Sequence, residues 1–325
     1  MCSINRSWGG RFSRRSASGS AGSPDGGRPA NRLARIRVRG RISDFSIALD
    51  YPLPQQKQPS RIDLLEIAQR LEPILLQAGR AIAGIYEQPE HRIQTKHDQT
   101  PVTEADLASH HLLVAALAGL TPSWPIVSEE DSQHHRSQSQ LNSRLKSAEA
   151  YWLIDPLDGT REFIARTGEF SINCGLVVGQ EAFFGMLYAP IQGTMYRGGQ
   201  TLSAQRKSHA EKNWQEIRCR EMPAAGGIQI SSRRSGQSQL HQPGMRHDHL
   251  GSALKFGRIA EATADLYIRR GPTMEWDTCA GQAIVQAAGG TVRCLDGSPL
   301  LYGKMDWRNP GFIARGRLAE SQAES

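Results

Sequence analysis

The residues with the clearest chemical potential are two carboxylates, Asp155 and Asp158, three positions apart. An apolar run leads into Asp155 and is typical of a buried strand. Pro156 has no N–H to extend a strand ladder, so we expect the strand to end at Asp155 and the chain to turn there. Gly159 and Thr160 then offer backbone N–H groups at a helix start, where phosphate binds. Two carboxylates facing a phosphate need cations between them, and this oxygen-rich pattern favours Mg²⁺.

The same segment is also explained by ordinary turn chemistry, because Asp, Pro and Gly are common turn residues. Two further acids shift the balance toward a metal site. Glu129 follows a short apolar strand, and Asp277 opens a helix predicted over residues 276–288. Asp277 also suits a plain helix cap. The four acids together indicate a metal site more strongly than any one of them.

A fifth acid, Asp106, has two compatible roles. Thr103 is predicted to begin a helix that runs to about Ala118, and Asp106 stands three residues after it, where it can complete a capping box. The first turn of a helix fixes the direction of its side chains, so the same carboxylate can also face the metal site.

The elements that must position these residues follow from the apolar spacing. A helix is expected from an N-cap near Ser60 and Asp63 to Ile82, with Pro73 kinking or dividing it. Residues 171–178 and 182–188 read as a hairpin. Further helices are expected at 254–264 and 276–288, and strands at 93–96, 226–232, 265–268, 291–294 and near Phe312, whereas residues 197–224 show no clear pattern. This order predicts an α/β layered enzyme.

The net charge of +7 belongs to the N-terminal end. Residues 1–43 hold ten Arg and one acid, which is +9, whereas the remainder holds 29 basic and 31 acidic residues, which is −2. Residues 1–59 are rich in Arg, Ser and Gly, and such composition predicts disorder. A transit peptide, an extension from a misplaced start codon and a basic RNA- or lipid-binding arm remain open. No nucleic-acid binding is expected of the body.

Membrane and metal-cysteine chemistry receive little support from the sequence. No apolar run approaches the roughly 20 residues that span a bilayer. The five cysteines are scattered and contain no CxxC pair, which argues against a disulfide framework or zinc site and fits a reducing compartment.

Several motifs in order resemble the inositol monophosphatase-like superfamily of Mg²⁺-dependent, lithium-sensitive phosphatases, and within it the bacterial 3′(2′),5′-bisphosphate nucleotidases. The likeness covers roughly residues 64–314. The motifs that carry it are Pro101–Asp106, Ser128–Glu130, Trp152–Ile164, Gly251–Phe256, Arg270–Thr273, Met274–Gly281 and Asn309–Phe312.

The resemblance implies a fold and a domain division. The fold would be an αβαβα sandwich of two mixed or antiparallel sheets between helix layers. Residues 60–325 would form the phosphatase domain, with a metal-binding lobe over 60–220 and a substrate lobe over 221–325.

The resemblance also implies residue roles. Two or more Mg²⁺ ions would be held by the following ligands: Glu129, Asp155, Asp158, Asp277 and the carbonyl of Leu157. Asp106 and Thr160 would position the attacking water and help to deprotonate it. The substrate would contact Gly159, Thr160, Ser252, Lys255, Arg269, Arg270 and Asp277. Ala253 and Arg161 depart from the usual Ser and Lys, which affects substrate affinity more than catalysis.

The implied reaction is removal of the 3′-phosphate of adenosine 3′,5′-bisphosphate, with 3′-phosphoadenylyl sulfate as a further substrate. Basic residues such as Lys255 and Arg269 suit a second phosphate. A sugar or inositol monophosphate phosphatase is the alternative, and a non-catalytic relative that binds RNA, membrane or a partner through its tail is a third reading.

The implied location is cytoplasmic, with peripheral association with the inner membrane as an option, and the oligomeric state stays open.

Overall fold

The computed structural model describes residues 63–88, 93–95, 101–132, 145, 147–223, 225–232 and 242–317. The predictions for residues 1–59 and for Ser60 lie outside these residues, as does most of the polar segment 132–150.

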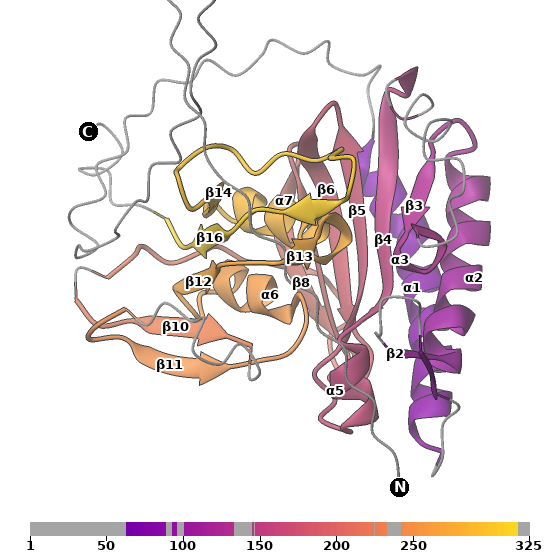
Figure 1. Cartoon of the computed structure of the whole chain (residues 1–325), viewed down its shortest axis with the longest axis horizontal. Helices are drawn as coiled ribbons and strands as arrows, with labels where there is room; N and C mark the ends of the chain where they lie inside the picture. Colours follow the sequence, from indigo (N-terminus) through magenta and orange to yellow (C-terminus); the bar gives the residue numbers. More distant parts are fainter. Residues whose placement is uncertain are drawn as a thin grey trace, which may run out of the picture. The chain divides into compact units, whose positions relative to one another are not determined.

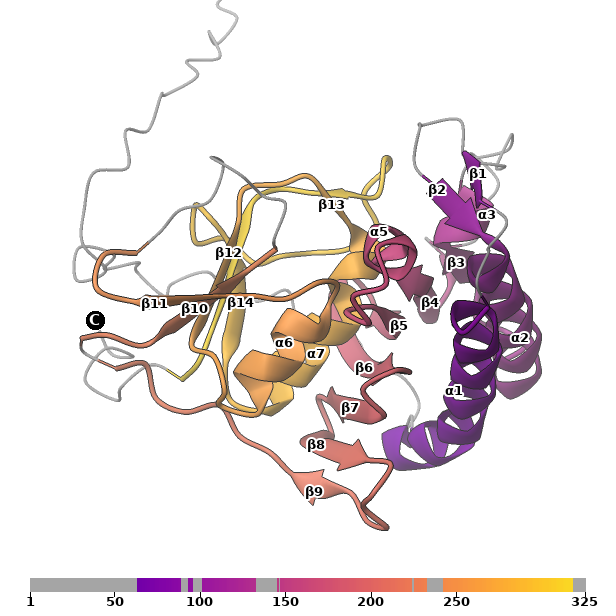
Figure 2. The same cartoon turned by 90° about the horizontal axis from the view of Figure 1, so that it is seen from below.

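Two long helices open the described chain. Helix α1 (Leu64–Tyr86) is capped by Asp63, whose Oδ1 accepts the N–H groups of Leu65 and Glu66 at 3.0 and 3.1 Å. Pro73 lies inside this helix and does not divide it. A small antiparallel pair, β1 (Ile93–Thr95) and β2 (Pro101–Thr103), leads to helix α2 (Glu104–Leu120), which packs alongside α1 (Figure 2).

The larger sheet has seven strands that follow one another in sequence order. The strands are β3 (Ile126–Ser128), β4 (Ala150–Asp158), β5 (Ser171–Val178), β6 (Glu181–Ala189), β7 (Thr194–Gly199), β8 (Leu202–Ser208) and β9 (Gln215–Glu216). Only the β3–β4 pair is parallel. The predicted hairpin over 171–188 is therefore confirmed as β5 and β6.

The expectation that the strand ends at Asp155 is wrong. Strand β4 continues to Asp158 through a bulge, because Asp155 pairs with Asn173 and Asp158 with Ser171, which leaves one extra residue on β4. A bulge tolerates a residue without a ladder N–H, so Pro156 fits it. The N–H of Leu157 donates to Asp155 Oδ1 at 3.0 Å and closes the bend.

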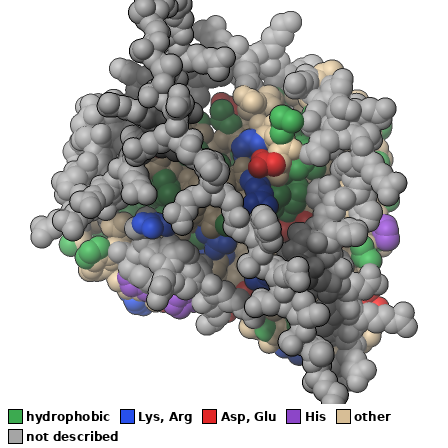
Figure 3. Space-filling model, in the orientation of Figure 1, with side chains coloured by type: hydrophobic (Ala, Val, Ile, Leu, Met, Phe, Trp, Pro, Cys, Tyr) green, Lys and Arg blue, Asp and Glu red, His purple; other side chains and the backbone are tan. Residues whose placement is uncertain are grey.

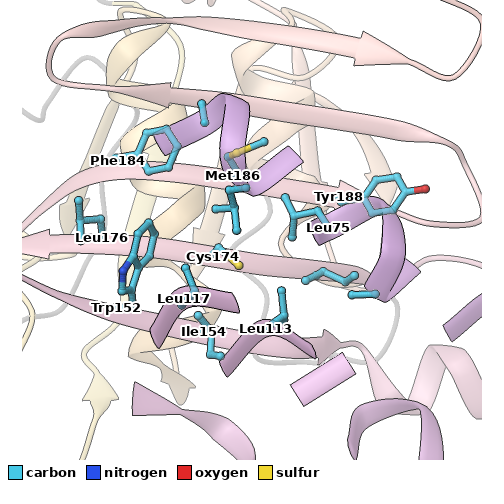
Figure 4. Close-up of a cluster of buried hydrophobic side chains, with 14 of the residues drawn as sticks. Leu75, Leu113, Leu117, Trp152, Ile154, Cys174, Leu176, Phe184, Met186 and Tyr188 are labelled. Atoms are coloured by element: carbon cyan, nitrogen blue, oxygen red, sulfur yellow. The ribbon is translucent and has the colours of Figure 1, made fainter. Parts of the chain in front are cut away.

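The first core lies between the two long helices and this sheet. Figure 4 shows leucines of both helices pointing at the strand residues of β4, β5 and β6. The labelled side chains are Leu75, Leu113, Leu117, Trp152, Ile154, Cys174, Leu176, Phe184, Met186 and Tyr188. Burial of this apolar area holds the two helices on one face of the sheet.

The opposite face is covered by helices α6 (Leu254–Ala260) and α7 (Cys279–Ala287), and a second sheet lies beyond them (Figure 1). The second sheet has the order β11 (Arg246–His249), β10 (Ile228–Ser231), β12 (Leu266–Arg269), β16 (Phe312–Arg315) and β14 (Thr291–Cys294). It is mixed, since β11, β10 and β12 are parallel and β16 is antiparallel to both of its neighbours.

Helix α7 approaches the first sheet closely because glycines face it. A Cβ on Gly185 would lie 2.2 Å from the Ala280 carbonyl oxygen, and one on Gly175 would lie 2.6 Å from Cys279 Sγ. Larger residues at these two strand positions would separate the helix from the sheet.

The layers confirm the predicted α/β sandwich of two main sheets. Among the described residues, no helix covers the outer face of the five-stranded sheet, so four of the five expected layers are visible (Figures 1 and 2). Short elements complete the part of the chain that is described: α3 (Glu129–Ser132), α5 (Thr160–Ile164), the 3₁₀ turn η3 (Glu275–Asp277), and the pair β13 (Thr273–Met274) and β15 (Arg308–Asn309).

Candidate metal and phosphate site

The parallel pair β3–β4 brings two predicted ligands to one edge of the sheet. Ser128 pairs with Ile154, so the next residues along, Glu129 and Asp155, follow neighbouring strand positions at the same edge. The two side chains are close enough for the charge of Glu129 to raise the pKa of Asp155.

Three of the predicted acids come together directly. Asp155, Asp158 and Asp277 each present a carboxylate oxygen, and these oxygens lie within 4.8 Å of one another. Asp277 reaches them from the 3₁₀ turn before α7, where its Oδ2 accepts the Met274 N–H at 2.7 Å. The predicted helix over 276–288 is thus split into η3 and α7, and Asp277 is both a cap and a member of the cluster.

Burial and mutual repulsion disfavour the charged form of these carboxylates. Burial raises the pKa of Asp155 well above its usual value, and the charges of Glu129, Asp158 and Asp277 raise it further. Burial and the charge of Asp158 raise the pKa of Asp277, against the lowering effect of its bond to the Met274 N–H. A divalent cation among these oxygens would remove the repulsion, so the donor set fits a hard metal ion.

Asp158 is hydrogen-bonded both to strand β5 of the first sheet and to the segment that precedes helix α6. Burial raises its pKa to about 6, although the charge of Lys255 and the hydrogen bond from Asn173 lower it. Its Oδ2 accepts from Asn173 Nδ2 at 3.2 Å and from the Ala253 N–H at 2.5 Å. The departure to Ala at position 253 leaves this contact intact, because the backbone donates.

Asp106 completes the predicted capping box and also contacts Thr160. Its Oδ2 accepts the Thr103 N–H at 2.8 Å and the Thr103 hydroxyl at 2.5 Å, which forms the capping box of α2. Its Oδ1 accepts the Thr160 hydroxyl at 3.1 Å. The predicted capping arrangement is present together with the link to Thr160.

Gly159 makes the turn between β4 and α5. Its φ is +97°, a left-handed conformation that glycine adopts without a Cβ penalty. A Cβ there would also lie 3.2 Å from the Cβ of Phe170. The turn directs the chain from Asp158 into the short helix that begins at Thr160.

A cavity of about 350 Å³ extends from this acidic end. Asp158, Gly159 and Asp277 line it together with the predicted substrate residues Ser252, Lys255 and Arg269. Arg270 does not line it and is exposed, so the structure does not bring this predicted residue to the site.

Lys255 is a buried cation within the cavity wall. It is 3% exposed, and its Nζ donates to the carbonyl oxygens of Leu250, at 3.2 Å, and of Ser252. The ammonium also lies 5.2 Å from the ring centre of Tyr267. Burial lowers the pKa of Lys255 to about 8, against the raising effect of the Asp158 charge.

Several lining residues were not singled out from the sequence. They are Glu162, Ser232, Phe256, Tyr267, Gly271, Thr273 and Thr278. All of them except Ser232 and Tyr267 stand inside motifs already named, so closeness in sequence to the predicted site residues was a usable signal. Tyr267 lies on β12 and Ser232 directly follows β10, and only the packing of the second sheet brings them here.

The described charged residues are mixed rather than separated on the face drawn in Figure 3, where an acidic side chain adjoins Lys or Arg side chains near the middle of the view. Within the described part of the chain, no helix is both long and apolar enough to cross a bilayer.

A two-sheet sandwich with a buried carboxylate cluster, beside a cavity that also carries Lys255 and Arg269, defines a metal-dependent phosphatase class, and comparisons place the chain within it. The model of the inositol monophosphatase family matches residues 63–324, so the chain belongs to that family.

Two curated relatives illustrate the likeness. The protein "3′(2′),5′-bisphosphate nucleotidase CysQ" of Escherichia coli strain K12 is 36% identical over 242 residues, which are 72% of this chain and 94% of the relative. The protein of the same name from Aggregatibacter actinomycetemcomitans is 34% identical over 259 residues, which are 77% of this chain and 90% of the relative.

Solved structures agree with the fold. The crystal structure of CysQ from Bacteroides thetaiotaomicron has a TM-score of 0.65 at 30% identity and covers 79% of this chain and 99% of its own. The extragenic suppressor protein SuhB from Bartonella henselae has a TM-score of 0.61 at 18% identity, covers 80% of this chain and 96% of its own, and supports the fold alone.

Proposed function

We propose that this chain is a Mg²⁺-dependent 3′(2′),5′-bisphosphate nucleotidase that removes the 3′-phosphate of adenosine 3′,5′-bisphosphate, with 3′-phosphoadenylyl sulfate as a further substrate. The observation that carries the proposal is the cavity that joins the Asp155–Asp158–Asp277 cluster to Lys255 and Arg269. Similarity to the named CysQ nucleotidases supports the choice of substrate.

Two or more Mg²⁺ ions would be held by Glu129, Asp155, Asp158, Asp277 and the Leu157 carbonyl. When bound, such ions lower the pKa of water and neutralise developing charge on phosphate oxygens.

The chain's own residues do the rest. The Thr160 hydroxyl donates a hydrogen bond to Asp106 Oδ1, so the lone pairs of the hydroxyl oxygen are available to a water molecule. Asp106 is 1% exposed, and a buried carboxylate in this position can take up a proton from the water through Thr160. The N–H groups of Gly159 and Thr160 contact the transferred phosphate at the start of α5.

Two cations of the cavity wall recognise the remaining phosphate. Lys255 and Arg269 are both cavity-lining cations, and their mutual repulsion contributes to the lowered pKa of Lys255. An anionic group between them relieves that repulsion, which favours a bisphosphate over a monophosphate.

The test is phosphate release with and without Mg²⁺ from adenosine 3′,5′-bisphosphate, inositol 1-phosphate and fructose 1,6-bisphosphate. We expect Mg²⁺-dependent release with preference for the adenosine substrate. Preference for either sugar phosphate would retain the metal site and reject the substrate assignment. No release from any of them would favour the reading in which the basic tail is the functional element.

We also propose that residues 60–325 form the catalytic domain, with lobes over 60–220 and 221–325, and that residues 1–59 are an extension outside it. Removal of residues 1–59 should leave kcat and KM unchanged, because every proposed site residue lies between Asp106 and Asp277. A tenfold loss of turnover on removing residues 1–59 would overturn this division of the chain.

The cytoplasmic location stays a prediction, to be checked by fractionating cells that express the full chain.

A further inference from the structure

Asn173 is a buried side chain whose amide oxygen and amide nitrogen are both hydrogen-bonded. It lies on β5 with 0% exposure. Its Oδ1 accepts the Ser171 hydroxyl at 2.8 Å, and its Nδ2 donates to Asp158 Oδ2 at 3.2 Å. The Asp158 carboxylate can only accept, so the Nδ2 end of the amide faces it, and Oδ1 is left to accept the Ser171 hydroxyl.

The contact to Asp158 is shared with the cavity wall. Asp158 Oδ2 also accepts the Ala253 N–H at 2.5 Å, and Ala253 immediately precedes helix α6, which carries Lys255. Both hydrogen bonds therefore converge on one oxygen of the carboxylate. The carboxylate is thus held by two donors from different parts of the fold, and one of its oxygens lies within 4.8 Å of a carboxylate oxygen of Asp155 and of Asp277.

The residue type at position 173 is not explained by packing. Its neighbours Ile172 and Cys174 are buried apolar side chains, but they point to the other side of the strand, as alternate residues do. A buried amide is costly unless its groups are bonded, so an apolar residue would be the cheaper choice if only volume mattered. A carboxylate of the same size would repel Asp158. The amide of Asn173 both accepts from Ser171 and donates to Asp158, which neither an apolar side chain nor a carboxylate can do.

We propose that Asn173 is a positioning residue for the metal site: through its hydrogen bond to Asp158 Oδ2, with Ser171 fixing its orientation, it directs Oδ1 of Asp158 toward the metal. The inference rests on the proposed function, because it assumes that Asp158 is a ligand. It adds two residues, Ser171 and Asn173, that contact neither substrate nor metal.

The experiment is titration of the full chain with Mn²⁺, a divalent probe whose free form is measured by electron paramagnetic resonance. We expect Asn173→Ala to weaken Mn²⁺ binding about tenfold, within the range typical of residues that orient metal ligands. Asn173→Asp should weaken it at least as much, because an acceptor would then face the Asp158 carboxylate. Ser171→Ala should give a smaller loss of the same sign.

The matched control is Thr121→Val. The Thr121 hydroxyl accepts the indole N–H of buried Trp152 at 2.9 Å, and Trp152 lies on β4 six positions before Asp158. The control therefore removes a buried hydrogen bond of the same strand that is not part of the metal site. It should lower the melting temperature and leave Mn²⁺ affinity unchanged. An equal loss of affinity in the control would overturn the proposal, because the effect would then reflect general destabilisation.

Wild-type affinity in folded Asn173→Ala would also overturn it. If that variant does not fold, Asn173→Ser and Ser171→Ala decide the matter by the same titration. Asp158→Asn separates the two proposals. Unchanged Mn²⁺ affinity in Asp158→Asn would reject the metal site itself, whereas weakened affinity there with normal affinity in Asn173→Ala would reject only the positioning role.

Discussion

Asp106 accepts hydrogen bonds on both carboxylate oxygens, from the Thr103 N–H and hydroxyl on Oδ2 and from the Thr160 hydroxyl on Oδ1. Helix α2 is therefore capped by the same group that holds the hydroxyl at the start of α5. Asp106 therefore links the start of α2 to the start of α5, so we expect a change of this carboxylate to affect both stability and the proposed reaction.

Replacing Asp106 by Asn should lower both kcat and stability, and a control at Thr103 tells the two effects apart. An amide still accepts through one oxygen but cannot take up a proton, so we expect kcat to fall by about 10²- to 10⁴-fold, the usual contribution of a general base. The stability cost should be about 1 kcal/mol, as for other lost caps. Steady-state kinetics and urea unfolding measure the two. Thr103→Ala is the control, since it weakens the cap and keeps the Thr160 bond. A similar loss of kcat in Thr103→Ala would contradict the proton role.

Asp155→Asn should abolish metal-dependent turnover and yet stabilise the metal-free protein near neutral pH. The raised pKa of Asp155 and the pKa of about 6 at Asp158 mean that the folded chain keeps protons that the unfolded chain has already lost between pH 4 and pH 6. Each such group lowers stability as pH rises, by up to about 1.4 kcal/mol per pH unit.

The free energy of unfolding in EDTA should therefore fall more steeply from pH 4.5 to 7 in the wild type than in Asp155→Asn. Added Mg²⁺ should restore stability in the wild type alone. If the free energy of unfolding depends on pH in the same way in both proteins, with and without Mg²⁺, the proposed repulsion among these carboxylates is contradicted.

Arg269 and Arg270 form a matched pair, since they are adjacent and only Arg269 lines the cavity. Arg269→Ala should raise KM for adenosine 3′,5′-bisphosphate by about tenfold or more, as expected for a lost charged contact, with less effect on a monophosphate. Arg270→Ala should change either KM by less than about twofold because the residue is exposed. The reverse order of effects would move the second phosphate site toward Arg270.

Two glycines should respond in opposite directions to the same change. Gly185→Ala places a Cβ 2.2 Å from the Ala280 carbonyl oxygen and should destabilise the protein by about 1–3 kcal/mol. Gly84→Ala lies within α1 with no atom within 4 Å of the new Cβ and should stabilise it by about 0.5–1 kcal/mol. Urea unfolding at one pH and Mg²⁺ concentration compares them, and a stabilised Gly185→Ala would refute the close packing of α7.

Helix caps, hairpins and strands could be predicted best where local chemistry or apolar spacing alone determines them. The Thr103–Asp106 spacing, the hairpin over 171–188 and the strand at 291–294 all follow from local chemistry or apolar spacing, and each is present. The four acids could be chosen only as a group, because turn chemistry or a helix cap also explains Asp155, Asp158 and Asp277 one by one.

Long-range pairing could not be read from the chain. Strand β8 was missed because its polar residues show no clear alternation, and it is held by pairing with β7. The bulge at Pro156 depends on the partner strand β5, and the distance of Arg270 from the cavity depends on how β12 ends. These features are set by the packed sheets rather than by any one segment.

The position of α7 has a consequence for synthesis of the protein on the ribosome. The seven-stranded sheet is complete in sequence at Glu216, but the helix that covers its glycine-lined face begins only at Cys279. Until that helix emerges, an apolar sheet face stays open to solvent and to other chains. We therefore expect the nascent chain to be more prone to aggregation during this interval than after α7 has packed, and slow translation between the two segments would lengthen the exposure.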